Sequence, residues 1–411
     1  MGTLNNALSP IWLTKTAFST SIGTLCPTKD NKILVFGESD HERGDFNIGR
    51  LTSSGAIDLT FNGKGFIEHE FPKAEGSLFL NPKAFVQDDG KIFLVGTLVE
   101  AEMYPAAARF DSTGAADTDF GEKGFAVFKD QSGTNQEALA AAKSKSKRAK
   151  STGANNLNAF RLPDEGYLIA SAETGYLLKL DESGALNSDF GDGGYLLPRL
   201  NDKRVIELQS AMVLGEHILV VGYVGASGYV ARFHLSGALD TDFGKEGSKP
   251  ISRTDANFVR LTGLSSRPNI SLSIAGFAHT TENKNGALLT RLNTAGAIDE
   301  GFNKGKPVLL NPAGRQADAR HVTTRRDDHV YIVGQTTFQD GSDPRFYAAA
   351  YRADGTLDND FTSGGWGLGP ERSTGMGMYL DAQNNLLICG TARDASNNYE
   401  GIVACYKPNA S

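Results

Sequence analysis

The chain has 411 residues, a formal net charge of −7 and 47 glycines. Its acidic balance argues against a general nucleic-acid-binding protein, which would show a basic footprint. No apolar run approaches the ~20 residues that a membrane-spanning helix needs. The glycine content suits a chain with many turns, and the length alone would suggest two or three domains.

The first residues, Met1 to Lys15, show no basic segment followed by an apolar one, so they do not resemble a Sec signal peptide. We therefore expect the protein to be cytoplasmic or exported without such a peptide, and an extracellular location stays open. The same stretch contains an incomplete copy of a repeat, because Gly2 to Trp12 aligns with Gly355 to Trp366 when one gap is allowed.

The repeat has the motif Gly-Ala-(Leu/Ile)-Asp-x-Asp-Phe-Gly-x-x-Gly, which is clearest from Gly237 to Gly247. Six clear copies follow one another at steps of 59, 70, 53, 59 and 59 residues, and they begin at Gly55, Gly114, Gly184, Gly237, Gly296 and Gly355. The C-terminal run Tyr406 to Asn409 resembles Tyr351 to Asp354, which precedes the last clear motif. The end of the chain therefore stops where its beginning would continue, as in a ring closed near the two termini.

Short apolar runs bounded by turn residues separate the motifs, and such runs are typical of strands. One strand of each unit is predicted from a short, mainly apolar run that ends in a small residue: Ile33 to Gly37, Ile92 to Gly96, Tyr167 to Ser171, Ile218 to Gly222, Ile270 to Gly276, Val330 to Gly334 and Leu386 to Gly390. The next strand leads into the motif: Phe46 to Leu51, Ala106 to Phe110, Tyr176 to Leu180, Tyr229 to Phe233, Leu288 to Leu292, Phe346 to Tyr351 and Ile402 to Tyr406. Another strand follows the motif, as in Phe66 to Phe71, and a fourth is less regular, as in Pro82 to Gln87.

Four strands in each of seven units predict an all-β fold, a seven-bladed β-propeller of four-stranded antiparallel blades with about 59 residues per repeat. We expect residues 1–411 to form this one domain. The motif itself is predicted to be a turn, in which glycine supplies positive φ and aspartate accepts backbone hydrogen bonds. Its single phenylalanine is predicted to wedge between neighbouring blades.

These motifs resemble the delta-60 repeat family, a bacterial β-propeller family, and the resemblance covers essentially the whole chain. It implies the propeller fold, and many members are parts of large secreted or surface-associated proteins. It implies no active-site residues. We assign no catalytic, cofactor or metal residues; Ca²⁺ binding by Asp-x-Asp pairs such as Asp240 and Asp242 is an alternative to turn capping, although the pattern lacks the closing Glu of a calcium loop.

Residues 130–155 form an insertion that is basic in an otherwise acidic chain. Five cations lie within eight residues: Lys143, Lys145, Lys147, Arg148 and Lys150. One hypothesis is an arm for an anionic partner such as nucleic acid, anionic lipid or an acidic protein surface. The alternative is a solvated loop, which the absence of aromatic residues for base stacking favours.

A cation also recurs near the end of the strand that precedes each motif, at Arg50, Arg109, Lys179, Arg232 and Arg291. These residues could form a ring that binds an anion, but local ion pairs with the motif aspartates are favoured because the pattern repeats. The three cysteines, Cys26, Cys389 and Cys405, are too few for a disulfide framework. Buried thiols are favoured over a cross-strand bridge between Cys389 and Cys405.

Three functions stay open at this point, because fold alone does not decide function. The first is a monomeric binding or scaffold propeller that recognises a protein or carbohydrate partner through irregular loops. Its candidate loops are Glu38 to Asp45, Thr281 to Gly286, Thr336 to Pro344 and Ala392 to Glu400, together with the basic insertion at 130–155. The second is a hydrolase or lyase with a site at the mouth of the central channel. The third is a component of a secreted toxin or surface assembly.

Overall fold

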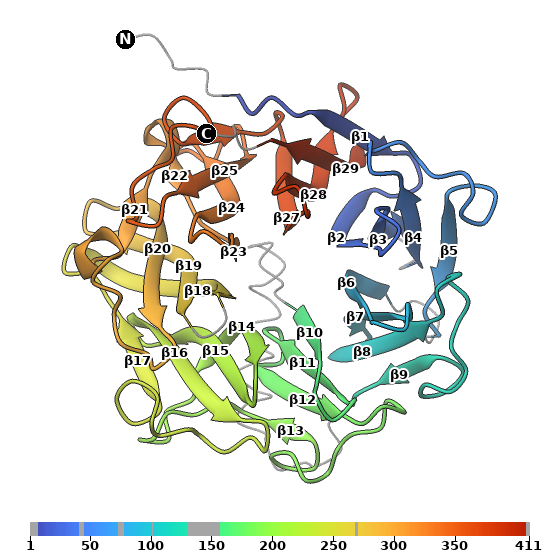
Figure 1. The fold of residues 1–411 in the computed structure, drawn as a ribbon, viewed down its shortest axis with the longest axis horizontal. Coiled ribbons are helices and arrows are strands. Elements are labelled where there is room, and N and C mark those ends of the chain that lie inside the picture. The colour runs from blue at the N-terminus through green and yellow to red at the C-terminus, as the bar shows by residue number, and fades with distance from the viewer. Residues whose placement is uncertain are drawn as a thin grey trace.

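The computed structural model describes residues 7–40, 45–72, 78–100, 102–129, 157–267 and 270–407. In this part of the chain, the strands form seven antiparallel sheets arranged as blades around a central axis (Figure 1). This arrangement confirms the predicted seven-bladed β-propeller. The predicted insertion at 130–155 lies outside the described residues.

Each blade is a meander that starts at the axis and ends at the rim, and the strand bounds follow blade by blade. Blade 1 contains β2 Ser21–Pro27, β3 Ile33–Asp40, β4 Asp45–Leu51 and β5 Phe66–Glu70. Blade 2 contains β6 Leu78–Val86, β7 Ile92–Val99, β8 Met103–Phe110 and β9 Phe125–Val127. Blade 3 contains β10 Leu157–Arg161, β11 Tyr167–Ser171, β12 Tyr176–Leu180 and β13 Tyr195–Leu196. Blades 4 and 5 contain β14 Glu207–Leu214, β15 His217–Val224, β16 Ser227–His234 and β17 Ser248–Ile251; and β18 Ala256–Arg267, β19 Ser271–Thr280, β20 Asn285–Asn293 and β21 Val308–Leu310.

The last two blades depart from this plan. Blade 6 contains β22 Gln316–Ala317, β23 His321–Thr324, β24 Val330–Thr337, β25 Arg345–Tyr351 and β26 Trp366–Leu368, and blade 7 contains β27 Ser373–Leu380, β28 Leu386–Arg393, β29 Tyr399–Tyr406 and β1 Trp12–Thr16. In blade 6, β22 and β23 both pair with β24 and together replace a single inner strand. Two 3-10 turns, Asn303–Gly305 and Pro312–Gly314, flank β21.

The N-terminal strand closes the ring. Strand β1 lies beside β29 at the rim of blade 7, with Trp12 opposite Cys405 and Thr16 opposite Gly401 (Figure 1). Just before it, the backbone N–H of Leu8 donates to the carbonyl of Leu368 in blade 6 at 2.9 Å. The N-terminal strand therefore completes the last blade, as the incomplete N-terminal copy of the repeat predicted.

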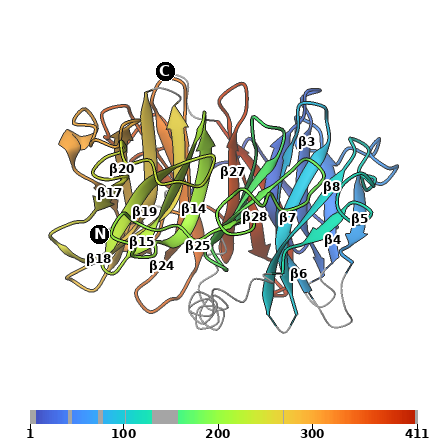
Figure 2. The same cartoon turned by 90° about the horizontal axis from the view of Figure 1, so that it is seen from below.

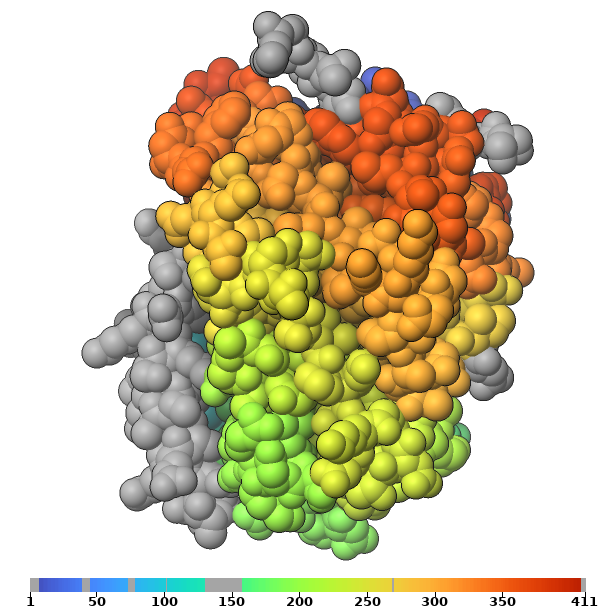
Figure 3. Space-filling view, turned by 90° about the vertical axis from the view of Figure 1, so that its left-hand side faces the viewer, coloured from blue at the N-terminus to red at the C-terminus, as the bar shows by residue number. Residues whose placement is uncertain are grey.

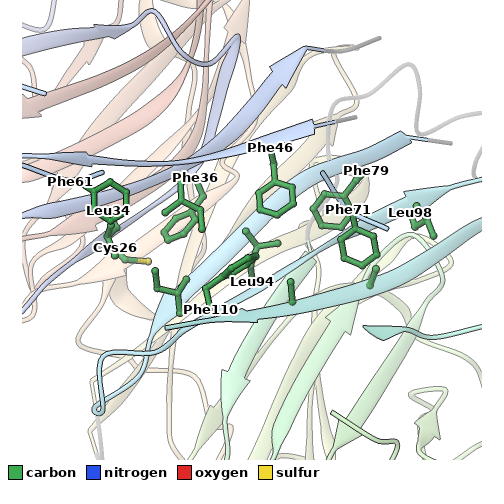
Figure 4. Close-up of a cluster of buried hydrophobic side chains, with 14 residues drawn as sticks. Cys26, Leu34, Phe36, Phe46, Phe61, Phe71, Phe79, Leu94, Leu98 and Phe110 are labelled. Atoms are coloured by element: carbon green, nitrogen blue, oxygen red, sulfur yellow. The ribbon is translucent and has the colours of Figure 1, made fainter. Parts of the chain in front are cut away.

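The blades pack against one another through apolar side chains. Strand β7 is buried along nearly its whole length, and its sequence is apolar except for Thr97, as expected for a strand covered on both faces. Between blades 1 and 2, the rings of Phe71 and Phe79 stack at 4.6 Å, and Phe46 lies 5.4 Å from Phe79 (Figure 4). The side view shows the blades standing as steeply inclined sheets around the axis (Figure 2). On the side of the ring seen in Figure 3, the colours run from green through yellow to orange, so the blades there follow one another in chain order.

The motif phenylalanine packs against the first motif glycine of the next blade. A Cβ built on Gly184 would lie 2.5 Å from Phe120, and one on Gly296 would lie 2.9 Å from Phe243. These glycines also have positive φ, +87° at Gly184 and +85° at Gly296. The predicted wedge is thus confirmed, and glycine is required at this contact for both its backbone angle and its size.

The cysteines are free thiols in the interior. Cys389 lies opposite Val403, and Cys405 lies opposite Leu387, so the two cysteines do not face each other. Cys26, Cys389 and Cys405 are all buried and unbridged. Burial raises the pKa of Cys389 to about 12. These thiols behave as small apolar side chains, and the bridge considered between Cys389 and Cys405 is not formed.

Candidate functional site

One side of the ring bears the connections between the second and third strands of the blades, and we call it the loop face. The four irregular loops singled out in the sequence are all such connections, so the topology places them on this one face. Residues 41–44 of the first loop lie outside the described residues. The loops after β24 and after β28 belong to neighbouring blades.

The loop after β24 presents an aromatic ring to solvent. Phe338 is 47% exposed. The turn that follows is closed by a hydrogen bond from the N–H of Gly341 to the carbonyl of Phe338 at 2.9 Å, and Gly341 takes a φ of +80°. The side chain of Asp340 accepts the N–H of Ser342 at 2.8 Å, as in an Asx-turn. The ring is therefore displayed on a loop that its own hydrogen bonds define.

A buried arginine holds the Phe338 ring in place. The guanidinium carbon of Arg315 lies 4.0 Å from the centre of the ring, although Arg315 itself is only 4% exposed. The Nη1 atom of Arg315 donates to Oδ2 of Asp343 at 3.2 Å, and Nη2 donates to the Asp343 carbonyl. Burial alone would raise the pKa of Asp343, but hydrogen bonds from Arg345 and Arg315 hold it below its usual range.

The network continues into blade 7. Nε of Arg345 donates to Asp343 at 2.9 Å, and its Nη2 donates to Glu371 at 2.8 Å. Glu371 and the following Arg372 lie in the connection from β26 to β27, which leads from blade 6 to blade 7. One bridging segment thus links the polar groups of the two blades.

A second aromatic ring ends the network. Tyr399 is 45% exposed, and the guanidinium carbon of Arg393 lies 4.4 Å from the centre of its ring. Arg393 also donates to the Tyr399 hydroxyl and, at 2.9 Å, to Oδ1 of Asn397. Arg372 approaches the same Asn397 oxygen at 3.5 Å. Blade 7 therefore repeats the arrangement of blade 6, an exposed ring backed by an arginine.

We call these residues the Arg–aromatic face: Arg315, Phe338, Asp343, Arg345, Glu371, Arg372, Arg393, Asn397 and Tyr399. Its hydrogen bonds fix long side chains before any partner arrives, which reduces the entropy lost on binding. Arginine and aromatic residues are also the types that dominate the energy of protein interfaces. Sequence reasoning named both loops but missed the pairing, because Arg315 and Phe338 meet only through the fold.

The inner rim of the ring holds a partly buried lysine. Nζ of Lys83 on β6 donates to the carbonyl oxygens of Gly23 at 2.5 Å and Met376 at 2.6 Å. Both acceptors lie at register shifts in β2 and β27, where a bulge leaves a residue outside the ladder. Burial lowers the pKa of Lys83. Its ammonium group thus joins the inner strands of blades 1, 2 and 7.

A histidine lies near this lysine. Burial, with the positive charges of Lys83 and Arg320, lowers the pKa of His321 to about 3. Arg320 pairs with Asp318, at 3.1 Å from Nε to Oδ1, and Asp318 also accepts the N–H of Gln335 at 2.9 Å. His321 is therefore neutral at neutral pH. The lysine, the arginine and the aspartate here are all engaged in contacts that hold strands together.

Four of the recurring cations form local ion pairs with motif aspartates, which is the interpretation that the repetition of the pattern favoured over an anion-binding ring. The Nε-to-Oδ2 distances are 2.7 Å for Arg50–Asp58, 2.7 Å for Arg109–Asp117, 2.6 Å for Arg232–Asp240 and 2.5 Å for Arg291–Asp299. Lys179 pairs with Asp164 at 2.7 Å instead. The other carboxylate oxygen caps the turn, as when Asp240 Oδ1 accepts the N–H of Asp242 at 3.1 Å. These contacts favour turn capping over the Ca²⁺ alternative.

The basic residues predicted to bind an anionic partner, Lys143, Lys145, Lys147, Arg148 and Lys150, lie outside the described residues. Their role stays a prediction. Within the described ranges, the protein contains no helix of the length and apolar character that crossing a membrane requires.

The family described as "Domain of unknown function (DUF5122) beta-propeller" matches residues 28–61. No curated protein matches the chain with significant similarity. Among solved structures, virginiamycin B lyase from Staphylococcus aureus is 8% identical, covers 96% of this chain and 99% of its own, and gives a TM-score of 0.49. The NanB sialidase from Streptococcus pneumoniae is 8% identical over 98% of this chain and 71% of its own, at a TM-score of 0.40. An unknown function protein from Dyadobacter fermentans is 11% identical over 98% and 100%, at 0.44. The family match and the seven blades together support a β-propeller repeat family.

Proposed function

We propose that this chain is a bacterial binding propeller of the delta-60 type that recognises a protein partner through the Arg–aromatic face. One observation carries the proposal: two exposed rings on neighbouring blades, Phe338 and Tyr399, are each held against an arginine, and the hydrogen-bonded groups around them are joined by the segment that contains Glu371 and Arg372. Arginine and aromatic side chains held in place on one face are the residue types that dominate the energy of protein interfaces.

The chemistry of the face fits a protein surface of mixed charge. Its arginines alternate with Asp343 and Glu371, so it offers donors and acceptors in close succession. Arg315 already covers Phe338, so a partner group would pack against the remaining exposed part of the ring. The two rings stand on separate blades, which suits a wide partner better than a single sugar. Interfaces of this kind place a few aromatic and arginine anchors at their centre.

The test compares two double variants of the full chain. We expect Phe338→Ala with Tyr399→Ala to weaken partner binding by about 2 kcal/mol or more, roughly 30-fold in Kd. The matched control is Leu59→Ala with Ile270→Ala, which removes two exposed apolar side chains, 65% and 49% exposed, from turns on the opposite side of the ring. Proteins captured from cell extract by the wild type are purified, and their affinities for each variant are measured by calorimetry. Equal affinity for the two double variants contradicts the proposal.

A further inference from the structure

Two histidines face each other at one end of the hairpin formed by β15 and β16. His217 lies directly opposite His234, and the centres of their rings are 5.4 Å apart. Directly opposed residues on neighbouring strands project from the same face of a sheet. The motif aspartate of the same blade completes a cluster, since one ligand atom from each of His217, His234 and Asp240 lies within 4.8 Å of the others.

This cluster is a departure from the repeat. The residues at the same two opposed positions in the other blades, read from the strand registers, are Lys32 and Thr52, Lys91 and Asp111, Gly166 and Asp181, Ser271 and Asn293, His329 and Arg352, and Asn385 and Lys407. Across the seven blades, which are all described at these positions, blade 4 is the one with a histidine at both. Elsewhere a lysine contacts the motif aspartate, as in Lys91–Asp117 at 2.9 Å.

One distance in the cluster is compatible with two ligands of a single metal ion. Nε2 of His217 lies 3.1 Å from Oδ2 of Asp240. A nitrogen and an oxygen bound to one tetrahedral Zn²⁺, each at about 2.0–2.1 Å, lie about 3.3 Å apart. These two atoms are therefore already spaced as ligands of one ion. His234 is exposed, so its ring can close the remaining gap by a small side-chain rotation.

The carboxylate is held in the way that metal-binding carboxylates are. Nε of Arg232 donates to Oδ2 of Asp240 at 2.6 Å, and the N–H of Asp242 donates to Oδ1 at 3.1 Å. Hydrogen-bonded partners of this kind orient a ligand, while the charge of Arg232 limits the affinity for a cation.

We propose that His217, His234 and Asp240 form a binding site for Zn²⁺ or a similar divalent transition metal on the motif side of blade 4. Imidazole and carboxylate ligands suit Zn²⁺, Ni²⁺ and Cu²⁺. Three protein ligands leave a coordination position for water or for a group from a partner. The site lies on the opposite side of the ring from the Arg–aromatic face and is independent of the proposed function.

The experiment is calorimetric titration of ZnCl2 into the full chain without a histidine tag. We expect one Zn²⁺ per chain, and at least tenfold weaker binding in each of two variants copied from other blades. His217→Lys reproduces the lysine–aspartate pair of blade 2, and His234→Asn reproduces Asn293 of blade 5, which caps its turn by accepting the N–H of Ala297 at 2.9 Å. Each substitution therefore introduces a residue that makes a stabilising contact at the same position of another blade.

The matched control is His329→Lys in blade 6, where the histidine contacts Asp358 at 3.6 Å but the opposed residue is Arg352. This variant is expected to bind Zn²⁺ as the wild type does. Cu²⁺ provides a second measurement, since nitrogen coupling in its electron paramagnetic resonance spectrum should show two imidazoles in the wild type and one in each variant. Absence of zinc binding, or equal binding by His217→Lys, His234→Asn and the wild type, overturns the proposal.

Discussion

At the scale of single residues, the motif glycine and the preceding motif phenylalanine fix the distance between blades. Gly184 combines a φ of +87° with a closest approach of 2.5 Å between a built Cβ and Phe120. Gly193 has a similar backbone, with a φ of +60°, but no atom lies within 4 Å of a built Cβ. Comparing alanine substitutions at the two glycines therefore distinguishes the energetic cost of positive φ from the cost of crowding the added methyl group.

We therefore expect Gly184→Ala to destabilise the fold more than Gly193→Ala. A left-handed backbone costs roughly 1–2 kcal/mol for a residue with a Cβ, and overpacking adds about 1–3 kcal/mol. The free energies of unfolding, measured by urea titration, should fall by roughly 1–2 kcal/mol for Gly193→Ala and by about 2–5 kcal/mol for Gly184→Ala. Equal losses would show that the wedge contributes nothing beyond backbone strain.

At the scale of strands, the inner rim depends on irregularities that create unpaired carbonyl groups and a space for side chains. The bulges in β2 and β27 leave two carbonyl groups outside the strand pairing, and Lys83 donates to both of them. The interruption between β22 and β23 places Arg320 and His321 near this lysine. His321 has a folded-state pKa of about 3, against 6.5 for the free side chain. Its neutral form is therefore the one that the fold accepts.

This difference predicts how stability changes with pH. Below pH 6.5 the unfolded chain binds a proton at His321 that the folded chain does not bind until about pH 3, so stability is complete above pH 6.5 and falls as the pH decreases through this window. The contribution has a slope of at most about 1.4 kcal/mol per pH unit. Urea titrations at pH 7.5, 5.5 and 4.5 should show a shallower decline for His321→Gln than for the wild type. Parallel declines would contradict the prediction.

Contacts that recur in several blades could be predicted from the repeated motif, whereas contacts that occur in a single blade were missed. The wedge of Phe120 and the pair of Arg109 with Asp117 follow from a motif that occurs six times. The facing of His217 and His234 was available in principle, because both lie at equal distances from the short turn after Val224. The contact of Lys83 with Gly23 and Met376 was not, since no local pattern marks which bulge carbonyls meet across blades.

At the scale of the whole molecule, the ring depends on its N-terminal strand. Strand β1 pairs with β29 over Trp12 to Thr16 and supplies the outermost strand of blade 7. Trp12 also packs against Gly55 of blade 1, and Leu8 is hydrogen-bonded to blade 6. One short segment thus contacts three blades at the place where the chain would otherwise be open.

Deletion of residues 1–16 should therefore affect the entire ring. It exposes the edge of β29, and an unpaired edge is a template for pairing with another chain. We expect a lower melting temperature and association of the truncated chain, seen by calorimetry and size-exclusion chromatography. A peptide of residues 7–20 should add as a strand, restore the melting temperature and suppress association, whereas a scrambled peptide should not. A truncated chain that melts like the full one would show that seven blades close through side-chain packing alone, with the shared strand dispensable.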